Sequence, residues 1–217
     1  TQAGCPVNVL TVVNRYVAED PAGTWEALKG YGYLQFIACL DDFEGPPAPH
    51  ALTPELYARF LIETYDLYDR SLRAGRYFSV RNFDNYLEML MGRPPENCAM
   101  RGECGVYYLV EGDGSVYPCD FYVLDEWRMG NVNEDSFAKL ALSPVAERFR
   151  QISRRRDPAC EACRYLPLCR GGCRRDREPC QNGDLSLNRF CSAYKAFFDA
   201  CLPRMESLAG EICRTPG

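Results

Sequence analysis

CEACRYLPLCRGGC, residues Cys160 to Cys173, decides how the second half of this chain folds. Two residues separate Cys160 from Cys163, five separate Cys163 from Cys169, and three separate Cys169 from Cys173. Gaps this short allow successive thiolates to face one inorganic centre, and the long gap to Cys191 brings in a further thiolate from elsewhere in the fold. The spacing therefore predicts a metal-binding segment and not a disulfide scaffold.

A second group of cysteines lies upstream of this segment. Five residues separate Cys98 from Cys104, and Cys119 follows after nine residues, Gly114 and four more. With the cysteines above, the chain has eight thiolates, which suit two four-thiolate sites and hence two [4Fe–4S] clusters. Two structural zinc sites are the alternative at this point, because CxxC pairs also serve zinc.

The composition limits the class of protein. The chain has 217 residues, of which 47% are hydrophobic, so it can bury one large core or two small ones. The formal net charge of −5 argues against a general nucleic-acid binder. Thirteen cysteines, with no signal peptide and no apolar run that could span a bilayer, predict a cytoplasmic protein without a membrane partner.

The first segment has an alternating strand and helix pattern. Val7 to Asn14 and Tyr33 to Leu40 are short apolar runs typical of buried parallel strands, and a helix-compatible stretch from Glu19 to Gly30 separates them. Two strands cannot close a barrel, so we expect the remaining strands to lie upstream of Thr1. Apolar residues at helical spacing predict a helix from Glu55 to Ala74.

The rest of the chain is predicted to be mostly helical, with a β-hairpin. A second helix is predicted from Phe83 to Met91. Cys104 to Cys119 alternates around Glu111 to Gly114, which indicates a hairpin. Helices are also predicted from Ser143 to Ser153 and from Asn188 to Ile212, while the segment from Cys160 to Cys173 is expected to be loop. The fold class is therefore α+β.

The order of the eight cysteines, with Gly114 between two of them, resembles SPASM domains, which hold two auxiliary [4Fe–4S] clusters in radical-SAM peptide-modifying enzymes. Several strings resemble the anaerobic sulfatase-maturating enzymes specifically: DGSVYPCDFYVLDEWRMGNV (113–132), CRGGCRRDRE (169–178), FCSAYKAFFD (190–199) and LQFIACLDD (34–42). The resemblance implies that residues 1–75 are the tail of a partial (β/α) radical-SAM barrel with a linking helix. Residues 76–217 would then be a mainly helical SPASM domain with a hairpin and two cluster-binding loops.

The resemblance also implies the cluster ligands. The first auxiliary cluster would be bound by Cys98, Cys104, Cys119 and Cys173. The second would be bound by Cys160, Cys163, Cys169 and Cys191. Cys5, Cys39, Cys180, Cys201 and Cys213 are left without a ligand role.

Asp120 directly follows a cluster ligand, and by the same resemblance it is the catalytic general base. The family oxidises a cysteine or serine of a sulfatase polypeptide to Cα-formylglycine. After a 5′-deoxyadenosyl radical removes hydrogen from Cβ, one proton and one electron must leave. A carboxylate in a sparingly solvated pocket can take the proton, and an auxiliary cluster can take the electron. A ferredoxin or flavodoxin would be the reductant.

The motif that holds the SAM-binding cluster, CxxxCxxC, does not occur in this sequence, since six residues separate Cys173 from Cys180. We expect SAM and a third [4Fe–4S] cluster in an upstream part, and we expect this chain alone to be inactive. Three other functions remain open: a maturase for another peptide, a ferredoxin-like electron carrier and a zinc-stabilised peptide-binding module.

Arginines surround the cysteine segment and could interact with an anionic cluster. All but three of the 25 basic residues are arginines. Those near the cysteines are Arg154, Arg155, Arg156, Arg164, Arg170, Arg174, Arg175 and Arg177. Guanidinium groups beside a cluster would stabilise its negative charge and tune its potential, whereas a solvated basic face would do neither.

Overall fold

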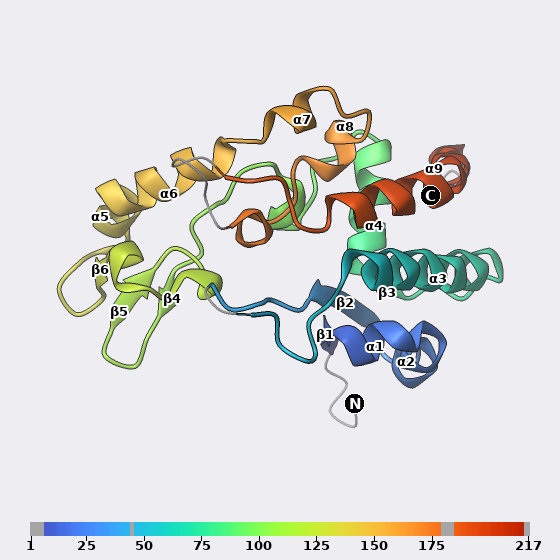
Figure 1. Cartoon of the computed structure of the whole chain (residues 1–217), viewed down its shortest axis with the longest axis horizontal. Helices are drawn as coiled ribbons and strands as arrows, with labels where there is room; N and C mark the ends of the chain where they lie inside the picture. Colours follow the sequence, from blue (N-terminus) through green and yellow to red (C-terminus); the bar gives the residue numbers. More distant parts are fainter. Residues whose placement is uncertain (1–6, 44–45, 179–184, 215–217) are drawn as a thin grey trace. The chain divides into compact units, whose positions relative to one another are not determined.

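The computed structural model describes residues 7–43, 46–178 and 185–214 (Figure 1). The chain forms two compact units, one of residues 1–97 with 189–217 and the other of residues 98–188. Residues 76–97 and 189–217 therefore pack with the first segment. The domain boundary predicted from the sequence, between residues 75 and 76, groups them with the second segment instead. Among the described residues, no helix is both long and apolar enough to cross a lipid bilayer.

A parallel sheet organises the first unit. Its strands are β1 (Asn8–Val13), β2 (Tyr33–Ala38) and β3 (Ser79–Val80), hydrogen-bonded in the order β1-β2-β3. β1 and β2 pair along their full length, from Asn8 opposite Tyr33 to Val13 opposite Ala38. The two predicted strands are confirmed. β3 was not predicted because two residues are too short to show a period.

The described part of the first unit also contains five α-helices: α1 (Arg15–Glu19), α2 (Pro21–Leu28), α3 (Pro54–Arg73), α4 (Arg81–Leu90) and α9 (Cys191–Arg214). The predicted helices over 55–74, 83–91 and 188–212 correspond to α3, α4 and α9. The single helix expected from Glu19 to Gly30 is two helices. Asp20 ends α1 and accepts a hydrogen bond from the Gly23 amide as the N-cap of α2, and Pro21 occupies the first turn.

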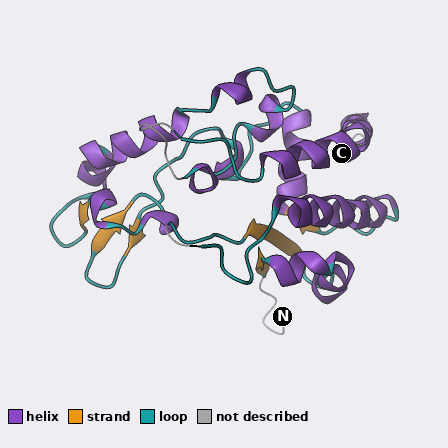
Figure 2. Cartoon of the chain, viewed as in Figure 1, coloured by secondary structure: helices purple, strands orange, loops and turns teal. Residues whose placement is uncertain are grey.

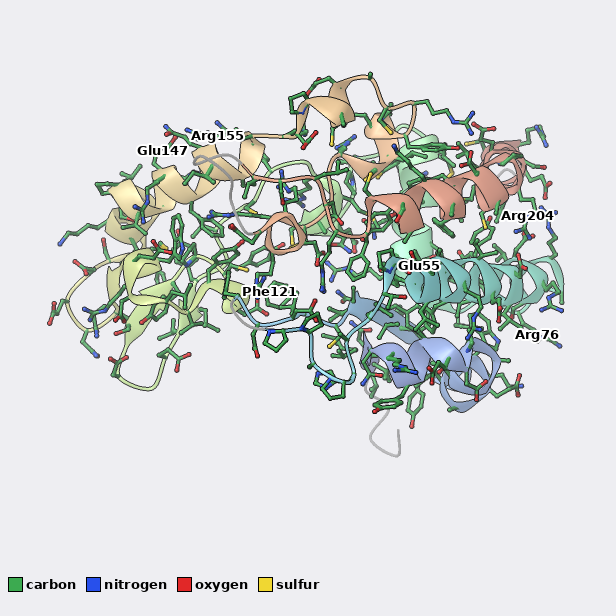
Figure 3. The ribbon with its side chains drawn as sticks, viewed as in Figure 1. Glu55, Arg76, Phe121, Glu147, Arg155 and Arg204 are labelled. Atoms are coloured by element: carbon green, nitrogen blue, oxygen red, sulfur yellow. The ribbon has the colours of Figure 1, made fainter. Side chains whose placement is uncertain are left out.

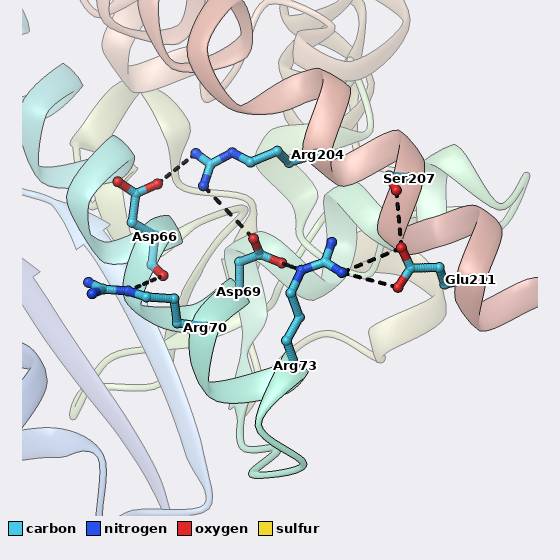
Figure 4. A network of polar contacts seen from close by, with 7 residues as sticks. All are labelled: Asp66, Asp69, Arg70, Arg73, Arg204, Ser207 and Glu211. Carbon is cyan, nitrogen blue, oxygen red and sulfur yellow. Dashed lines mark hydrogen bonds and ion pairs between the residues drawn. The ribbon is translucent and has the colours of Figure 1, made fainter.

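The helices α3 and α9 pack together through aromatic side chains and an ion network. Tyr65, Phe83 and Phe197 are fully buried and lie 5.3 to 6.1 Å apart between ring centroids. Beside them, Asp69 pairs with Arg73 at 2.9 Å and with Arg204 at 3.8 Å (Figure 4). Arg204 also contacts Asp66, and Arg73 also contacts Glu211. The long C-terminal helix that begins at Cys191 is thereby fixed to α3.

The second unit contains a small antiparallel sheet of β4 (Leu109–Val110), β5 (Ser115–Tyr117) and β6 (Gly130–Asn131), drawn as short strands in Figure 2. β4 and β5 form the predicted hairpin. Gly114 in the turn has φ of +85°, and a Cβ atom there would lie 2.5 Å from Asn133 Nδ2 and 2.6 Å from Asn131 Oδ1. The turn therefore requires glycine.

Short helices make up the rest of the second unit: α5 (Phe137–Ala141), α6 (Pro144–Arg154), α7 (Pro158–Glu161) and α8 (Leu166–Cys169). α6 confirms the prediction over 143–153. The segment from Cys160 to Cys173 is not entirely loop, because α7 ends and α8 lies within it. Asp157 caps α7, and Pro158 and Pro167 favour the first turns of α7 and α8. The described fold is mixed α and β, as expected.

Candidate functional site

The four cysteines of the first predicted group lie in loops and 3-10 turns of the second unit. Cys98 begins a 3-10 turn, Cys98–Met100. The Cys104 amide donates to Ser153 Oγ on α6 at 2.8 Å, which fixes the turn that carries it. Cys119 follows β5 and precedes the 3-10 turn Asp120–Tyr122, and Cys173 precedes the 3-10 turn Arg174–Arg177. Because these cysteines lie outside regular helices and strands, the directions of their side chains are set by packing and not by a helical or strand period.

These four thiols lie within electrostatic range of one another. Burial raises the pKa of Cys104, and the Cys98 thiol raises it further. Burial, above all, raises the pKa of Cys173 well above its usual value, and Cys104 and Cys98 contribute. Burial also raises the pKa of Cys119 to about 12, with a smaller contribution from Cys104. Buried thiols with raised pKa values stay protonated unless a metal displaces the proton.

The four thiols of the first group are donors that both a zinc ion and a [4Fe–4S] cluster accept. Among the described residues, no three His, Cys, Asp or Glu side chains lie close enough together to hold one metal ion. A tetrahedral zinc site places each thiolate about 2.3 Å from one centre, whereas in a [4Fe–4S] cluster each thiolate binds a different iron. The eight candidate ligands have side chains of intermediate exposure.

The second predicted group is distributed over both units. Cys160 lies in α7, Cys169 ends α8, and Cys163 lies between them with its amide bonded to the Cys160 carbonyl at 3.0 Å. Arg170 then takes a left-handed conformation, φ 49°, which turns the chain after α8. Cys191 is the first residue of α9 in the other unit.

Asp120 is exposed, and its carboxylate lies next to a candidate ligand. The Cys119 thiol donates to Asp120 Oδ1 at 3.3 Å. Phe121, labelled in Figure 3, follows Asp120 within the same 3-10 turn. The sparingly solvated pocket expected for a general base is not formed around Asp120 by the described residues.

The arginines near the cysteines divide into exposed and buried groups. Arg154 is half-exposed and pairs with Glu103 at 2.6 Å. By contrast, Arg174, Arg175 and Arg177 are buried, at 2%, 8% and 2% exposure. The solvated-face interpretation therefore fails for the turn that follows Cys173.

Arg174 lies in an aromatic cage. Its guanidinium carbon is 4.6 Å from the ring centre of Tyr122 and 4.5 Å from those of Trp127 and Phe149. Its Nε also donates to Glu178 Oε1 at 3.4 Å. Cation–π contacts of this kind stabilise a desolvated charge. Sequence reasoning missed the three aromatic residues, because they are dispersed along the chain and share no pattern.

Three of the remaining cysteines lie in the described part of the chain. Cys39 and Cys201 are buried and Cys213 is exposed. Cys5 and Cys180 lie outside the described residues.

Comparisons with known proteins agree with this chemistry. Residues 98–164 match the family model of the SPASM domain, an iron–sulfur cluster-binding domain. The cysteine-type anaerobic sulfatase-maturating enzyme of Clostridium novyi (strain NT) is 39% identical over 206 residues, covering 93% of this chain and 55% of the relative. The serine-type enzyme of Bacteroides thetaiotaomicron is 27% identical over 229 residues, covering 96% of this chain and 55% of the relative.

Solved structures show the same similarity. Native anSMEcpe with bound AdoMet and Cp18Cys peptide superposes with a TM-score of 0.88 at 36% identity, covering 94% of this chain and 58% of that one. The chain is therefore homologous to one part of the anaerobic sulfatase-maturating enzymes, and it spans about half the length of the curated relatives it matches.

Proposed function

We propose that this chain is the auxiliary-cluster part of a radical-SAM oxidoreductase that converts a cysteine or serine of a sulfatase polypeptide to Cα-formylglycine. The observation that carries the proposal is the group of four neighbouring thiols, Cys98, Cys104, Cys119 and Cys173, of which Cys119 contacts Asp120, within a chain homologous to the sulfatase-maturating enzymes. The parallel strands β1 to β3 and their helices would be the tail of the partial barrel. SAM, a third cluster and a ferredoxin or flavodoxin reductant would complete the system.

Two [4Fe–4S] clusters are the cofactors proposed for this chain. Cys98, Cys104, Cys119 and Cys173 would hold the first, and Cys160, Cys163, Cys169 and Cys191 the second. When bound, they supply a low-potential acceptor for one electron. Each thiol must lose its proton to serve as a ligand, so loading releases protons and is favoured as the pH rises.

Asp120 is proposed to move the proton in this reaction. Oxidation of a substrate thiol or hydroxyl to the thioaldehyde or aldehyde removes one hydrogen atom, one proton and one electron in total. The Asp120 carboxylate would accept the proton from sulfur or oxygen. Its exposed position in contact with Cys119 supports this role, since a peptide could reach the carboxylate and Cys119 would be one of the residues that hold the electron acceptor. Without a CxxxCxxC motif, this chain alone would be inactive.

Metal analysis after anaerobic reconstitution tests the proposal most directly. Two four-iron clusters require about eight iron and eight sulfide per chain, a brown colour and bleaching by dithionite. A colourless protein with stoichiometric zinc and no iron uptake would support the zinc-module alternative and contradict the proposal. Two clusters with no effect of Asp120 on maturation would favour the electron-carrier alternative.

A further inference from the structure

The Arg177 side chain is a buried cation without a carboxylate partner among the described residues. It is 2% exposed, and its Nη1 and Nη2 donate to the backbone carbonyls of Arg155 at 2.7 Å and Ser153 at 3.0 Å. Arg155 is labelled in Figure 3. Arg177 Nε is buried and has no hydrogen-bond partner within residues 7–43, 46–178 and 185–214. A buried guanidinium with an unused donor is costly unless an anion compensates it.

A second guanidinium increases this need for an anion. Arg156 also has a buried Nε without a partner, and its Nη2 reaches only the Gly102 carbonyl, at 3.4 Å. Both side chains lie against Gly171, where a Cβ atom would be 3.8 Å from Arg177 Nη1 and 3.9 Å from Arg156 Cδ. The Arg156 charge lowers the pKa of Arg177, in addition to the larger effect of burial. Two like charges side by side favour a negative group between or beside them.

Arg177 interacts with two thiols of the first group. Ser153 links it to Cys104, because the Ser153 carbonyl accepts from Arg177 and the Ser153 hydroxyl accepts from the Cys104 amide. Burial lowers the pKa of Arg177, and Cys104 and Cys173 are the largest influences that oppose this effect. Arg174 differs, since Glu178 and three aromatic rings already compensate its charge.

We propose that the Arg177 guanidinium is a fixed counter-charge for the thiolates of Cys104 and Cys173, and that it sets the reduction potential of the cluster they hold. This inference rests on the proposed function. A positive charge in a low-dielectric site stabilises the more negative, reduced state of a cluster, so it raises the potential. Arg177 is a positioning and tuning residue and does not contact the substrate.

Three variants of the full chain, reconstituted without oxygen, test the inference. Arg177→Met removes the charge, Arg177→Lys keeps it, and Arg154→Met removes an equal charge from a half-exposed site as the matched control. The measurements are iron per chain and the midpoint potential of each cluster from redox titration followed by electron paramagnetic resonance. In Arg177→Met, one midpoint should fall by about 59 mV, a tenfold decrease in the one-electron equilibrium constant for reduction.

The other cluster, the Arg177→Lys variant and the Arg154→Met control should keep potentials near those of the wild type. Full iron with both potentials unchanged in Arg177→Met would overturn the inference. If Arg177→Met loses iron, the iron content of Arg177→Lys distinguishes the two explanations. Retained iron in Arg177→Lys supports a role of the charge. Loss of iron from both variants shows that only the hydrogen bonds to the carbonyls matter, and it overturns the inference. A wild-type chain that binds no iron overturns the proposed function itself, which is a distinct result.

Discussion

The proton transfer proposed for this protein depends on a single functional group, the carboxylate of Asp120. Asparagine keeps the shape of aspartate but cannot accept a proton at neutral pH. In an enzyme that carries this segment together with the radical-generating part, Asp120→Asn should leave iron content and 5′-deoxyadenosine release largely intact. Formylglycine production from a sulfatase-derived peptide should fall by about 10²- to 10⁴-fold, as is typical for loss of a general base. Mass spectrometry of the peptide checks this.

Retention of the wild-type rate of formylglycine production in Asp120→Asn would show that Asp120 is only a turn residue. A matched control is Asp125→Asn, which changes another carboxylate in a 3-10 turn five residues further along the chain. It should leave both SAM cleavage and product formation unchanged.

Two cysteines without a ligand role should differ sharply in reactivity. Cys201 is fully buried in α9, and burial raises its pKa to about 11. Because the thiolate is the nucleophile, Cys201 is expected to react with iodoacetamide at pH 8 at least about tenfold more slowly than Cys213, which is exposed on the same helix. Peptide mass spectrometry over a time course measures both rates in one sample. Equal rates would mean that α9 opens readily.

The pairing of α3 with α9 depends on one carboxylate more than on its neighbours. Asp69 has only 8% of its side chain exposed and contacts both Arg73 and Arg204, whereas Asp66 is 40% exposed. Asp69→Asn should lower the free energy of unfolding by about 1–3 kcal/mol, since it weakens two charged interactions in a shielded site. Asp66→Asn, the matched control, should change it by less than about 1 kcal/mol. Urea denaturation compares the two, and equal effects would contradict the assignment.

For the whole molecule, cluster binding and folding of the cysteine-rich region are expected to be coupled. Apart from Cys191, which begins the long helix α9, the candidate ligands lie in turns and short helices that have few other means of fixing their geometry. Cys163→Ala and Cys191→Ala should each lose about four of the eight iron atoms and make residues from about 155 to 195 sensitive to protease. Helices α3 and α4 should remain protected. Cys213→Ala, at an exposed position, serves as the control.

Unchanged iron content and unchanged protease resistance in both ligand variants would refute the assignment of the second group. If only Cys191→Ala kept full iron, the fourth ligand of that group would have to come from another residue.

The sequence by itself determined those features that depend on local pattern. The apolar runs at 7–14 and 33–40 and the helical period at 55–74 predict β1, β2 and α3, because each pattern is long enough to show its period. The alternation around the turn from Glu111 to Gly114 predicts the hairpin, because glycine and aspartate at the centre of an alternating segment favour a tight turn. The cysteine spacing predicts thiolate sites because ligand gaps are a local property of the chain.

Tertiary structure decided the features that depend on residues far apart in the sequence. β3 forms only because β2 offers an edge, and its two residues carry no pattern of their own. Eight arginines near the cysteines are alike in sequence, but Arg174 is enclosed by Tyr122, Trp127 and Phe149, while Arg177 is buried with no carboxylate partner in the described part of the chain. Burial and counter-charge are properties of the packed interior and not of the local sequence, so only the folded chain distinguishes a structural arginine from one that faces the thiols.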